Sequence, residues 1–430
     1  MSQLILPQPR AQRLERTPPF TALARQQLVT RLGRLSDGQL RLTVPSNASD
    51  GAVETLTFGR ETADLPTVEL RVLSERFWGA VAFGGSVGAG ESYIHGDWQV
   101  NDLTALIRLM TRNASVLEDL EGGLARLTGP ARRILHWFNR NDLSGSRRNI
   151  AAHYDLGNAF FERMLDPTMA YSSAIYPSSS ASLHEAQLFK FDTICRKLDL
   201  RPGDELLEIG TGWGGLAIHA AQRYGANVTT TTISKEQHDF ARDAVARAGL
   251  TDRVTLLFDD YRDLKGTFNK LVSIEMIEAV GHQFLDTYLG TCSSRLSPDG
   301  MMLLQAITLQ DQSYEAALKQ VDFIQRFVFP GSFIPSVSAI TASLTRATDL
   351  KVFDLEDIGP HYARTLADWR HNVFADTQAI RDLGYSDEFL RLWEFYLCYC
   401  EGGFAERHIG DVQLLLTKPR CRRAPLRVAE

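Results

Sequence analysis

The sequence has few cysteines, and their spacing is typical of neither a metal site nor a disulfide framework. The five cysteines are Cys195, Cys292, Cys398, Cys400 and Cys421. None forms a C-x-x-C pair, and an odd count argues against a disulfide framework. We therefore expect a protein of a reducing compartment that binds no metal ion.

Long hydrophobic runs are also missing. The longest weakly polar run, WGAVAFGGSVGAG, is rich in glycine and far shorter than the ~18 residues that span a bilayer. The first residues, MSQLILPQPRAQRLERTPPF, lack the continuous apolar core of a signal peptide. We expect a cytoplasmic protein that associates peripherally with the inner face of the membrane.

A strong excess of charge of either sign is absent. The formal net charge is −6, with 44% hydrophobic and 23% charged residues, which is typical of a globular protein. The chain as a whole is not basic, so its charge does not indicate a nucleic-acid partner. We expect no nucleic-acid partner. The 430 residues suggest two domains, since domains usually have about 100 to 200 residues.

One local basic segment, residues 123–150, stands out as a linker. It carries Arg126, Arg132, Arg133, Arg140, Arg147 and Arg148 against the single acid Asp142. The segment is either a solvated connector or a surface that meets an anionic membrane, where each cation adds about 1 kcal/mol.

The membrane interpretation predicts that neutralising four of these arginines weakens binding to anionic vesicles. The loss should be larger at low salt than at high salt, because salt screens exposed charges. The variant replaces Arg132, Arg133, Arg147 and Arg148, and vesicle sedimentation measures the binding. Equal sedimentation of variant and wild type at both salt concentrations would leave the segment a connector.

Residues 1–122 precede this linker and read as a small α+β domain. Three short segments alternate between apolar and polar residues, QLRLTV, VETLTF and VELRVL, which predicts a small antiparallel sheet. Helical spacing follows in DLTALIRLMTR.

Residues 151–430 show a different pattern, in which strands alternate with helices. The strands DELLEIG, NVTTTTI, RVTLLF, NKLVSIEM and GMMLLQAIT are separated by segments such as GGLAIHAAQRYG and SKEQHDFARDAVARAG. This alternation predicts a doubly wound α/β domain with a parallel sheet covered on both faces. Ligands of such folds bind at the carboxyl ends of the strands, where the strand order reverses.

A glycine-rich turn, EIGTGWGG, follows the first of these strands. A dinucleotide site would need an acid about 20 residues after the first glycine, but Thr230 stands there. Instead Glu208 precedes Gly210, which produces the pattern ExGxGxG. That pattern resembles the signature of S-adenosylmethionine-dependent methyltransferases, whose cofactor is a cation. The alternative is a tight structural turn without a ligand.

Further motifs narrow the resemblance to one family. HYDLGNAFFERMLDPTMAYSS, TISKEQ, DDYRDL, SIEMIEAVG and FVFPGSFIPS occur in order, and residues 147–417 resemble the cyclopropane fatty acid synthase family. GESYIHGDW extends the likeness into the N-terminal domain, which the resemblance implies is a lipid-associated domain, residues 1–122. The resemblance implies that S-adenosylmethionine methylates the cis double bond of an unsaturated phospholipid acyl chain, which then closes to a cyclopropane.

The same resemblance assigns the residues that bind the cofactor. By motif they are Tyr171, Ser172, Glu208, Gly210, Thr211, Gly212, Trp213, Gly214, Thr232, Ile233 and Gln237, with Tyr261 and Arg262 on the adenine side. Methylation of a weakly nucleophilic alkene also needs a dry pocket lined by aromatic rings. Candidates for that lining, each of which could equally be plain core, are Phe160, Phe161, Phe323, Phe327, Phe329, Phe333 and Trp369.

The residues for proton removal depart from the family pattern. The family holds a bicarbonate ion with a Cys, a Glu, a His, a Tyr and an Ile backbone group. Here Glu278 and Ile307 remain, whereas the Cys, His and Tyr positions are Ser173, Gln305 and Arg370. Replacing Cys, His and Tyr by Ser, Gln and Arg changes the electrostatics of the anion site. Binding of bicarbonate by this chain is therefore only an expectation that the resemblance implies.

Two neighbouring residues, Cys400 and Glu401, complete the catalytic candidates. Glu401 either supplies a base or forms a structural ion pair with Arg370. The exchanged residues resemble a branch of the family linked to methylene or methyl-branched fatty acids, whose products need a separate reductase. Two other functions stay open as alternatives, a small-molecule methyltransferase and a catalytically silent lipid-binding protein. A homodimer is kept as an expectation about assembly.

Overall fold

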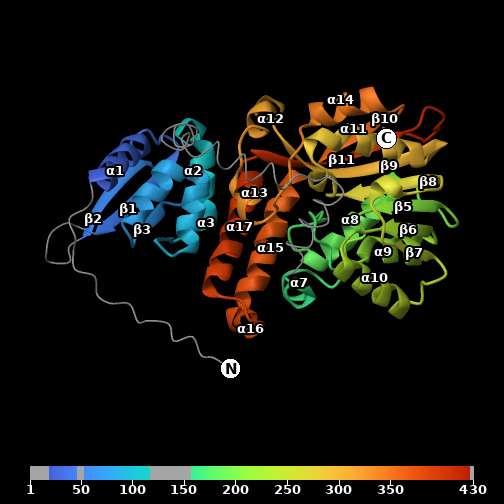
Figure 1. Ribbon diagram of the computed structural model, residues 1–430, viewed down its shortest axis with the longest axis horizontal. Coiled ribbons are helices and arrows are strands. Elements are labelled where there is room, and N and C mark those ends of the chain that lie inside the picture. Colours follow the sequence, from blue (N-terminus) through green and yellow to red (C-terminus); the bar gives the residue numbers. More distant parts are fainter. Residues whose placement is uncertain (1–18, 46–52, 117–155, 427–430) are drawn as a thin grey trace.

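The computed structural model describes residues 19–45, 53–116 and 156–426. The basic segment 123–150 lies outside these residues. Figure 1 shows an N-terminal domain beside a pair of long helices, with a large α/β domain on their other side. Within the described residues, no helix has both the length and the apolar character that crossing a membrane requires.

The N-terminal domain is built on a four-stranded mixed sheet with the order β2-β1-β3-β4. Its elements are α1 (Pro19–Leu32), β1 (Gly38–Pro45), β2 (Val53–Arg60), β3 (Val68–Val72), α2 (Arg76–Ile94), β4 (Trp98–Val100) and α3 (Leu103–Arg112). Strand β1 pairs antiparallel with β2 but parallel with β3. The prediction of an antiparallel sheet was therefore wrong for this pair, because alternation specifies which face is buried but not which strands become neighbours.

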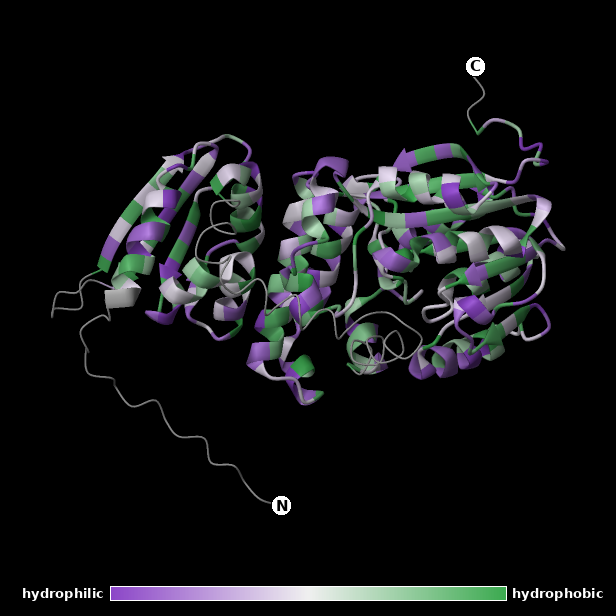
Figure 2. Cartoon of the chain, turned by 45° about the horizontal axis from the view of Figure 1, so that its top comes forward, coloured by the Kyte–Doolittle hydropathy of each residue, from purple (hydrophilic) through white to green (hydrophobic). Residues whose placement is uncertain are grey.

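One face of this sheet is apolar and packs against the helices. In β1 and β3 the buried residues alternate along the strands, as the bands in Figure 2 show. Helix α2 contributes Phe77 and Trp78, and α3 contributes Leu109. Helix α2 is interrupted at Gly85, whose φ of 56° and ψ of −141° are not helical.

The large domain has a seven-stranded sheet with the order β10-β11-β9-β8-β5-β6-β7. Its strands are β5 (Glu205–Ile209), β6 (Asn227–Thr231), β7 (Val254–Leu257), β8 (Phe268–Ile274), β9 (Leu296–Leu309), β10 (Lys351–Asp357) and β11 (Ile409–Thr417). Strands β5 to β9 are parallel, and β11 runs antiparallel to both of its neighbours. The order reverses at β5, so the predicted doubly wound α/β fold is confirmed, with an antiparallel strand near one edge.

Helices cover both faces of this sheet. One apolar cluster joins it to α11 (Leu285–Arg295) and α14 (Val337–Ala347), and another joins it to α8 (Leu183–Lys197) and α9 (Gly215–Tyr224). The remaining helices are α7 (Asn158–Met164), α10 (Lys235–Arg247), α12 (Asp311–Ala317), α13 (Phe323–Phe327), α15 (Gly359–Ala375), α16 (Thr377–Asp382) and α17 (Asp387–Ala405), with short 3₁₀ turns at η2 (Tyr261–Asp263), η3 (Ile277–Ala279) and η4 (His282–Phe284).

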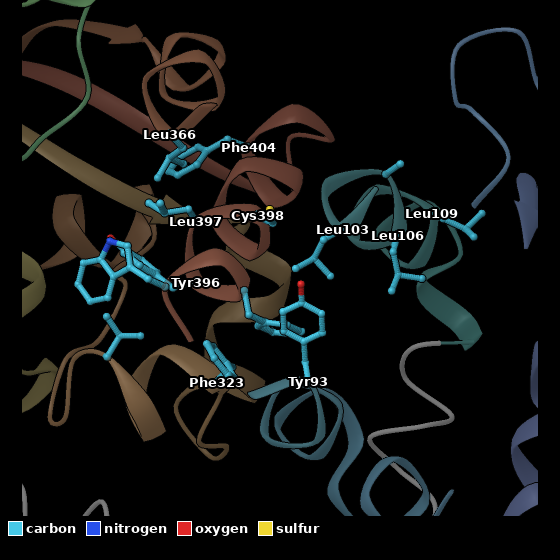
Figure 3. Packing of buried hydrophobic residues seen from close by; sticks show 14 of the residues in the cluster. Tyr93, Leu103, Leu106, Leu109, Phe323, Leu366, Tyr396, Leu397, Cys398 and Phe404 are labelled. Carbon is cyan, nitrogen blue, oxygen red and sulfur yellow. The ribbon is translucent and has the colours of Figure 1, made fainter. Parts of the chain in front are cut away.

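Helix α17 joins the two domains. Figure 3 shows Tyr93 of α2 and Leu103 of α3 directed toward it. The Tyr93 hydroxyl donates to Glu394 over 2.7 Å, and Arg108 and Arg112 both pair with Glu406. The two domains therefore meet through an apolar contact that is flanked by charged groups.

Candidate active site

The glycine-rich turn lies at the carboxyl end of β5, next to the point where the strand order reverses. Gly210, Gly212 and Gly214 have φ values of 102°, 53° and 93°, a region that residues with a Cβ rarely adopt. The Gly210 and Thr211 amides donate to the carbonyl of Thr231, which ties the turn to β6. A Cβ on Gly212 would meet no atom within 4 Å, so this glycine faces open space.

Glu208 lies beneath this turn and is only 3% exposed. Its Oε2 accepts a hydrogen bond of 2.6 Å from the Thr230 hydroxyl. Burial raises the pKa of the Glu208 carboxyl to about 8. A bound cation would favour its ionised form, which suits a positively charged ligand better than a phosphate.

A cavity of about 730 Å³ opens in front of the turn. Its described lining includes every predicted cofactor residue except Gly214: Tyr171, Ser172, Glu208, Gly210, Thr211, Gly212, Trp213, Thr232, Ile233, Gln237, Tyr261 and Arg262. Arg262 lies over the Tyr261 ring and pairs with Asp260 at 2.7 Å. The Trp213 indole donates to Asn158. The structure thus brings together residues that lie far apart in the sequence.

The aromatic candidates divide into two groups. Phe329 and Phe333 line the cavity. The others, Phe160, Phe161, Phe323, Phe327 and Trp369, belong to the hydrophobic core or pack against it and are not among the described lining residues.

Glu278 faces the same cavity from η3, beyond the end of β8. Its Oε1 accepts a hydrogen bond of 2.6 Å from the Ile307 amide, whereas its buried Oε2 has no partner among the described residues. Burial, assisted by the neighbouring Glu275, raises the pKa of Glu278 to about 8. Helix α11 begins only at Leu285 and has Asp286 in its first turn. Glu278 therefore does not serve as a stabilising charge at the N-terminus of this helix.

A second carboxylate, Glu275, was missed by the sequence reasoning. Its Oε1 accepts hydrogen bonds from the Ser173 amide and the Gln305 side chain, both 2.8 Å, and its Oε2 accepts one of 2.6 Å from Tyr362. Glu275 lines the cavity and has a φ of 48°. The only signal in the sequence is its position three residues before Glu278.

Behind Glu275 lies a buried polar network. The Gln305 amide also donates to Asp411 over 3.0 Å and accepts from Gln413. Burial raises the pKa values of Glu275 and Asp411, and the negative charge of Glu275 raises that of Asp411 further.

Lys190 is completely buried and donates to the Ser172 hydroxyl over 2.6 Å. Its pKa falls to about 8 because burial disfavours the ammonium.

Arg370 and Glu401 form an ion pair of 3.0 Å between α15 and α17. Glu401 also accepts a hydrogen bond from Thr104 of the N-terminal domain. Neither Arg370 nor Glu401 is among the described lining residues, whereas Cys400 is. Burial raises the pKa of the Cys400 thiol, which keeps it protonated at neutral pH.

A turn suited to a cationic ligand and two carboxylates thus line the same, largely apolar cavity. Of the five positions that the resemblance assigned to the anion site, Glu278 and Ile307 are hydrogen-bonded to each other, and Ser173 and Gln305 both contact Glu275. Arg370 pairs with Glu401 instead. Chemically, such a site can stabilise a carbocation and accept a proton.

Comparison with known proteins gives consistent results. A family model described as mycolic acid cyclopropane synthetase matches residues 141–414. The chain is 36% identical to tuberculostearic acid methyltransferase UfaA1 of Mycobacterium tuberculosis, over 78% of this chain and 79% of that protein. It is 37% identical to cyclopropane-fatty-acyl-phospholipid synthase of Escherichia coli K12, over 81% of this chain and 88% of that protein.

Solved structures agree with these sequence matches. The mycolic acid cyclopropane synthase CmaA1, complexed with SAH and CTAB, has a TM-score of 0.58 and 30% identity, covering 63% of this chain and 98% of that one. The cyclopropane synthase MmaA2 from Mycobacterium tuberculosis has a TM-score of 0.59 and 29% identity, covering 65% and 100%.

Proposed function

This chain belongs to the mycolic acid cyclopropane synthetase family, and on that premise we propose that it methylates the cis double bond of an unsaturated phospholipid acyl chain. The methyl donor is S-adenosylmethionine. One observation carries the proposal: the ExGxGxG turn and the carboxylates Glu275 and Glu278 line a single cavity. The cavity also continues over a long run of apolar side chains, which a methyltransferase for soluble substrates would not need.

The chemistry explains why both features are needed. The alkene attacks the methyl carbon, the sulfur–methyl bond breaks, and one former alkene carbon becomes a cation. In a dry cavity, carboxylates and the rings of Tyr171 and Phe329 stabilise this charge. Loss of a proton to a base then completes the reaction. Glu278 is suited to be that base, because its Oε2 has no partner among the described residues and its pKa is about 8.

Glu275 takes the place that the family resemblance gives to bicarbonate, as a fixed negative charge beside the base Glu278. Ser173 and Gln305, at two of the positions expected to hold the anion, donate hydrogen bonds to the Glu275 carboxylate. In this proposal Glu275 is a built-in replacement for the ion, and its charge makes Glu278 a stronger base.

The same cation can also lead to a second product. If a base removes a proton from the new methyl group while the cation stays on the other former alkene carbon, the electron pair of the broken C–H bond joins the two carbons and a cyclopropane forms. If a hydride first shifts between the two carbons, proton loss from the methyl group leaves a methylene branch instead, which a separate reductase would convert to a methyl branch. The chain is 36% identical to a protein named tuberculostearic acid methyltransferase, which is why the methylene outcome stands beside the cyclopropane.

The reaction is tested by lipid analysis after expression in a host without its own synthase. We expect unsaturated acyl chains to gain the mass of one methylene group, and NMR to distinguish ring protons from vinylidene protons. Purified enzyme should prefer oleoyl phospholipid in vesicles to soluble acceptors. Methylation of soluble acceptors alone would refute the proposal.

The role of Glu275 is tested by Glu275→Gly in bicarbonate-free buffer. Glycine tolerates the φ of 48° at this position and opens the space that the carboxylate fills. We expect the variant to lose turnover and to recover part of it when bicarbonate is added, while the wild type stays indifferent to bicarbonate. Dependence of the wild type on bicarbonate would show that Glu275 does not replace the ion.

A further inference from the structure

We propose that the N-terminal domain receives the methyl-terminal part of the acyl chain inside its own core. This inference rests on the proposed function, since it specifies where the substrate of that reaction lies. It assigns to residues 19–112 a binding site for a hydrocarbon chain.

The observation behind it is the extent of the cavity. The space that begins at the cofactor turn continues between the two domains and into the N-terminal one. There its described lining comes from the sheet, from α1 and from the helices α2 and α3: Leu28, Leu32, Leu40, Leu42, Leu70, Phe77, Val81, Gly85, Ser86, Ala89, Trp98, Leu106, Ile107, Met110 and Thr111.

The chemistry of this lining determines what can occupy it. Among the described residues that line the N-terminal part of the cavity, none is ionisable, and only Ser86 and Thr111 carry a side-chain hydroxyl group. A phosphate or a headgroup placed there would lose its hydration without an ionic partner. A hydrocarbon chain gains instead, because each buried methylene favours binding by about fourfold.

The position of the double bond explains why such a compartment is needed. A double bond in the middle of a chain has hydrocarbon on both sides, and one side leads to the polar headgroup. When the double bond lies near Glu278, the free end must pass into a second apolar space. The N-terminal part of the cavity is continuous with the reaction site, and its described lining residues are uncharged, so it suits the methyl end.

Residues of α2 and α17 form the wall of this compartment and of its connection to the reaction site. The break in α2 at Gly85 lies on the cavity wall. Between the domains, Phe395, Tyr399 and Gly403 of α17 line the connecting space. Helices α17 and α3 approach closely at Gly402, where a Cβ would lie 2.7 Å from the Ile107 side chain. The ion pairs of Glu406 with Arg108 and Arg112 add to this contact.

Photocrosslinking tests the location directly. Vesicles of oleoyl phospholipid would carry a diazirine either at the methyl end of the acyl chain or next to its carbonyl. We expect the methyl-end probe to label peptides within residues 28–111, and the carbonyl probe to label the large domain. Labelling of the large domain alone by both probes would overturn the inference.

A second test narrows the compartment with Ala89→Phe. We expect kcat/KM for oleoyl phospholipid to fall about tenfold relative to myristoleoyl phospholipid, whose chain ends sooner beyond the same double bond, because the ring displaces about two methylenes. Gly79→Phe is the matched control on the same helix, since a Cβ there would meet no atom within 4 Å. An unchanged ratio for Ala89→Phe would contradict the inference.

The two proposals fail differently. If the wild type methylates no vesicle lipid, the proposed function is wrong and this inference falls with it. If it methylates lipid but neither crosslinks the N-terminal domain nor changes its chain-length preference in the Ala89→Phe variant, this inference alone is wrong.

Discussion

Glu278→Gln is expected to yield a folded protein that binds S-adenosylmethionine and methylates unsaturated phospholipid about 10²-fold more slowly, or slower still. Glutamine keeps the shape of the side chain and can still accept the hydrogen bond from the Ile307 amide, but it cannot take up a proton. Calorimetry measures cofactor binding, and the formation of S-adenosylhomocysteine measures turnover.

The pH dependence gives a second readout for the same residue. A base must be ionised to act, and the pKa of Glu278 is raised to about 8, so turnover of the wild type should rise with pH up to about 8. The raised pKa also means that the folded state favours the protonated carboxyl. The stability contributed by this group is therefore lost as pH rises from the ordinary carboxyl range toward 8. Glu278→Gln should lose less stability across that window than the wild type.

Glu388→Gln is the matched control. Glu388 is exposed in the first turn of α17, so the substitution removes a favourable helix-terminal charge worth only about 0.3 to 1 kcal/mol. It should leave turnover unchanged. Near-normal turnover of Glu278→Gln would refute the base assignment and make Glu275, the other carboxylate that the proposal places at the reaction site, the next residue to test by substitution with glutamine.

Gly212→Val is expected to abolish binding of S-adenosylmethionine. Gly212 has a φ of 53°, and a Cβ there would project into open space beside the turn. In the proposed function the cofactor fills that space, so the valine side chain would collide with it. Calorimetric titration with S-adenosylmethionine should detect no heat of binding.

The backbone cost of this substitution needs its own control. Forcing a branched residue into the left-handed region costs about 1 to 2 kcal/mol and could lower stability without any effect on a site. Gly249 has a φ of 68°, and a Cβ there would also meet no atom within 4 Å, but this residue does not line the described part of the cavity. Gly249→Val should lose similar stability and bind cofactor normally. Normal binding by Gly212→Val would remove the turn from the site.

The N-terminal sheet shows what the alternation of apolar and polar residues can predict and what it cannot. The alternation in QLRLTV and VELRVL correctly indicated strands with one buried face. It could not indicate that β1 and β3 lie parallel as neighbours, because the direction of pairing depends on how the connection from β2 crosses the sheet. The same limit applies to the cavity in this domain, whose walls come from three helices and several strands.

The carboxylates show a related limit. Glu278 was singled out from its motif, whereas Glu275 in the same motif was not, although it accepts three hydrogen bonds from three separate segments. Arg370 and Glu401 were correctly considered as a pair, but only the structure adds Thr104 of the other domain as a partner of Glu401.

The sequence by itself determined the doubly wound α/β fold, the family and the glycine turn, since each depends on the order and local spacing of residues along the chain. Only the tertiary structure decided that Glu275 contacts Ser173 and Gln305, and that the cavity extends into the N-terminal domain. The physical reason is that hydrogen bonds and cavity walls form between side chains brought together from distant segments. Those contacts depend on distance in space, which local spacing does not encode.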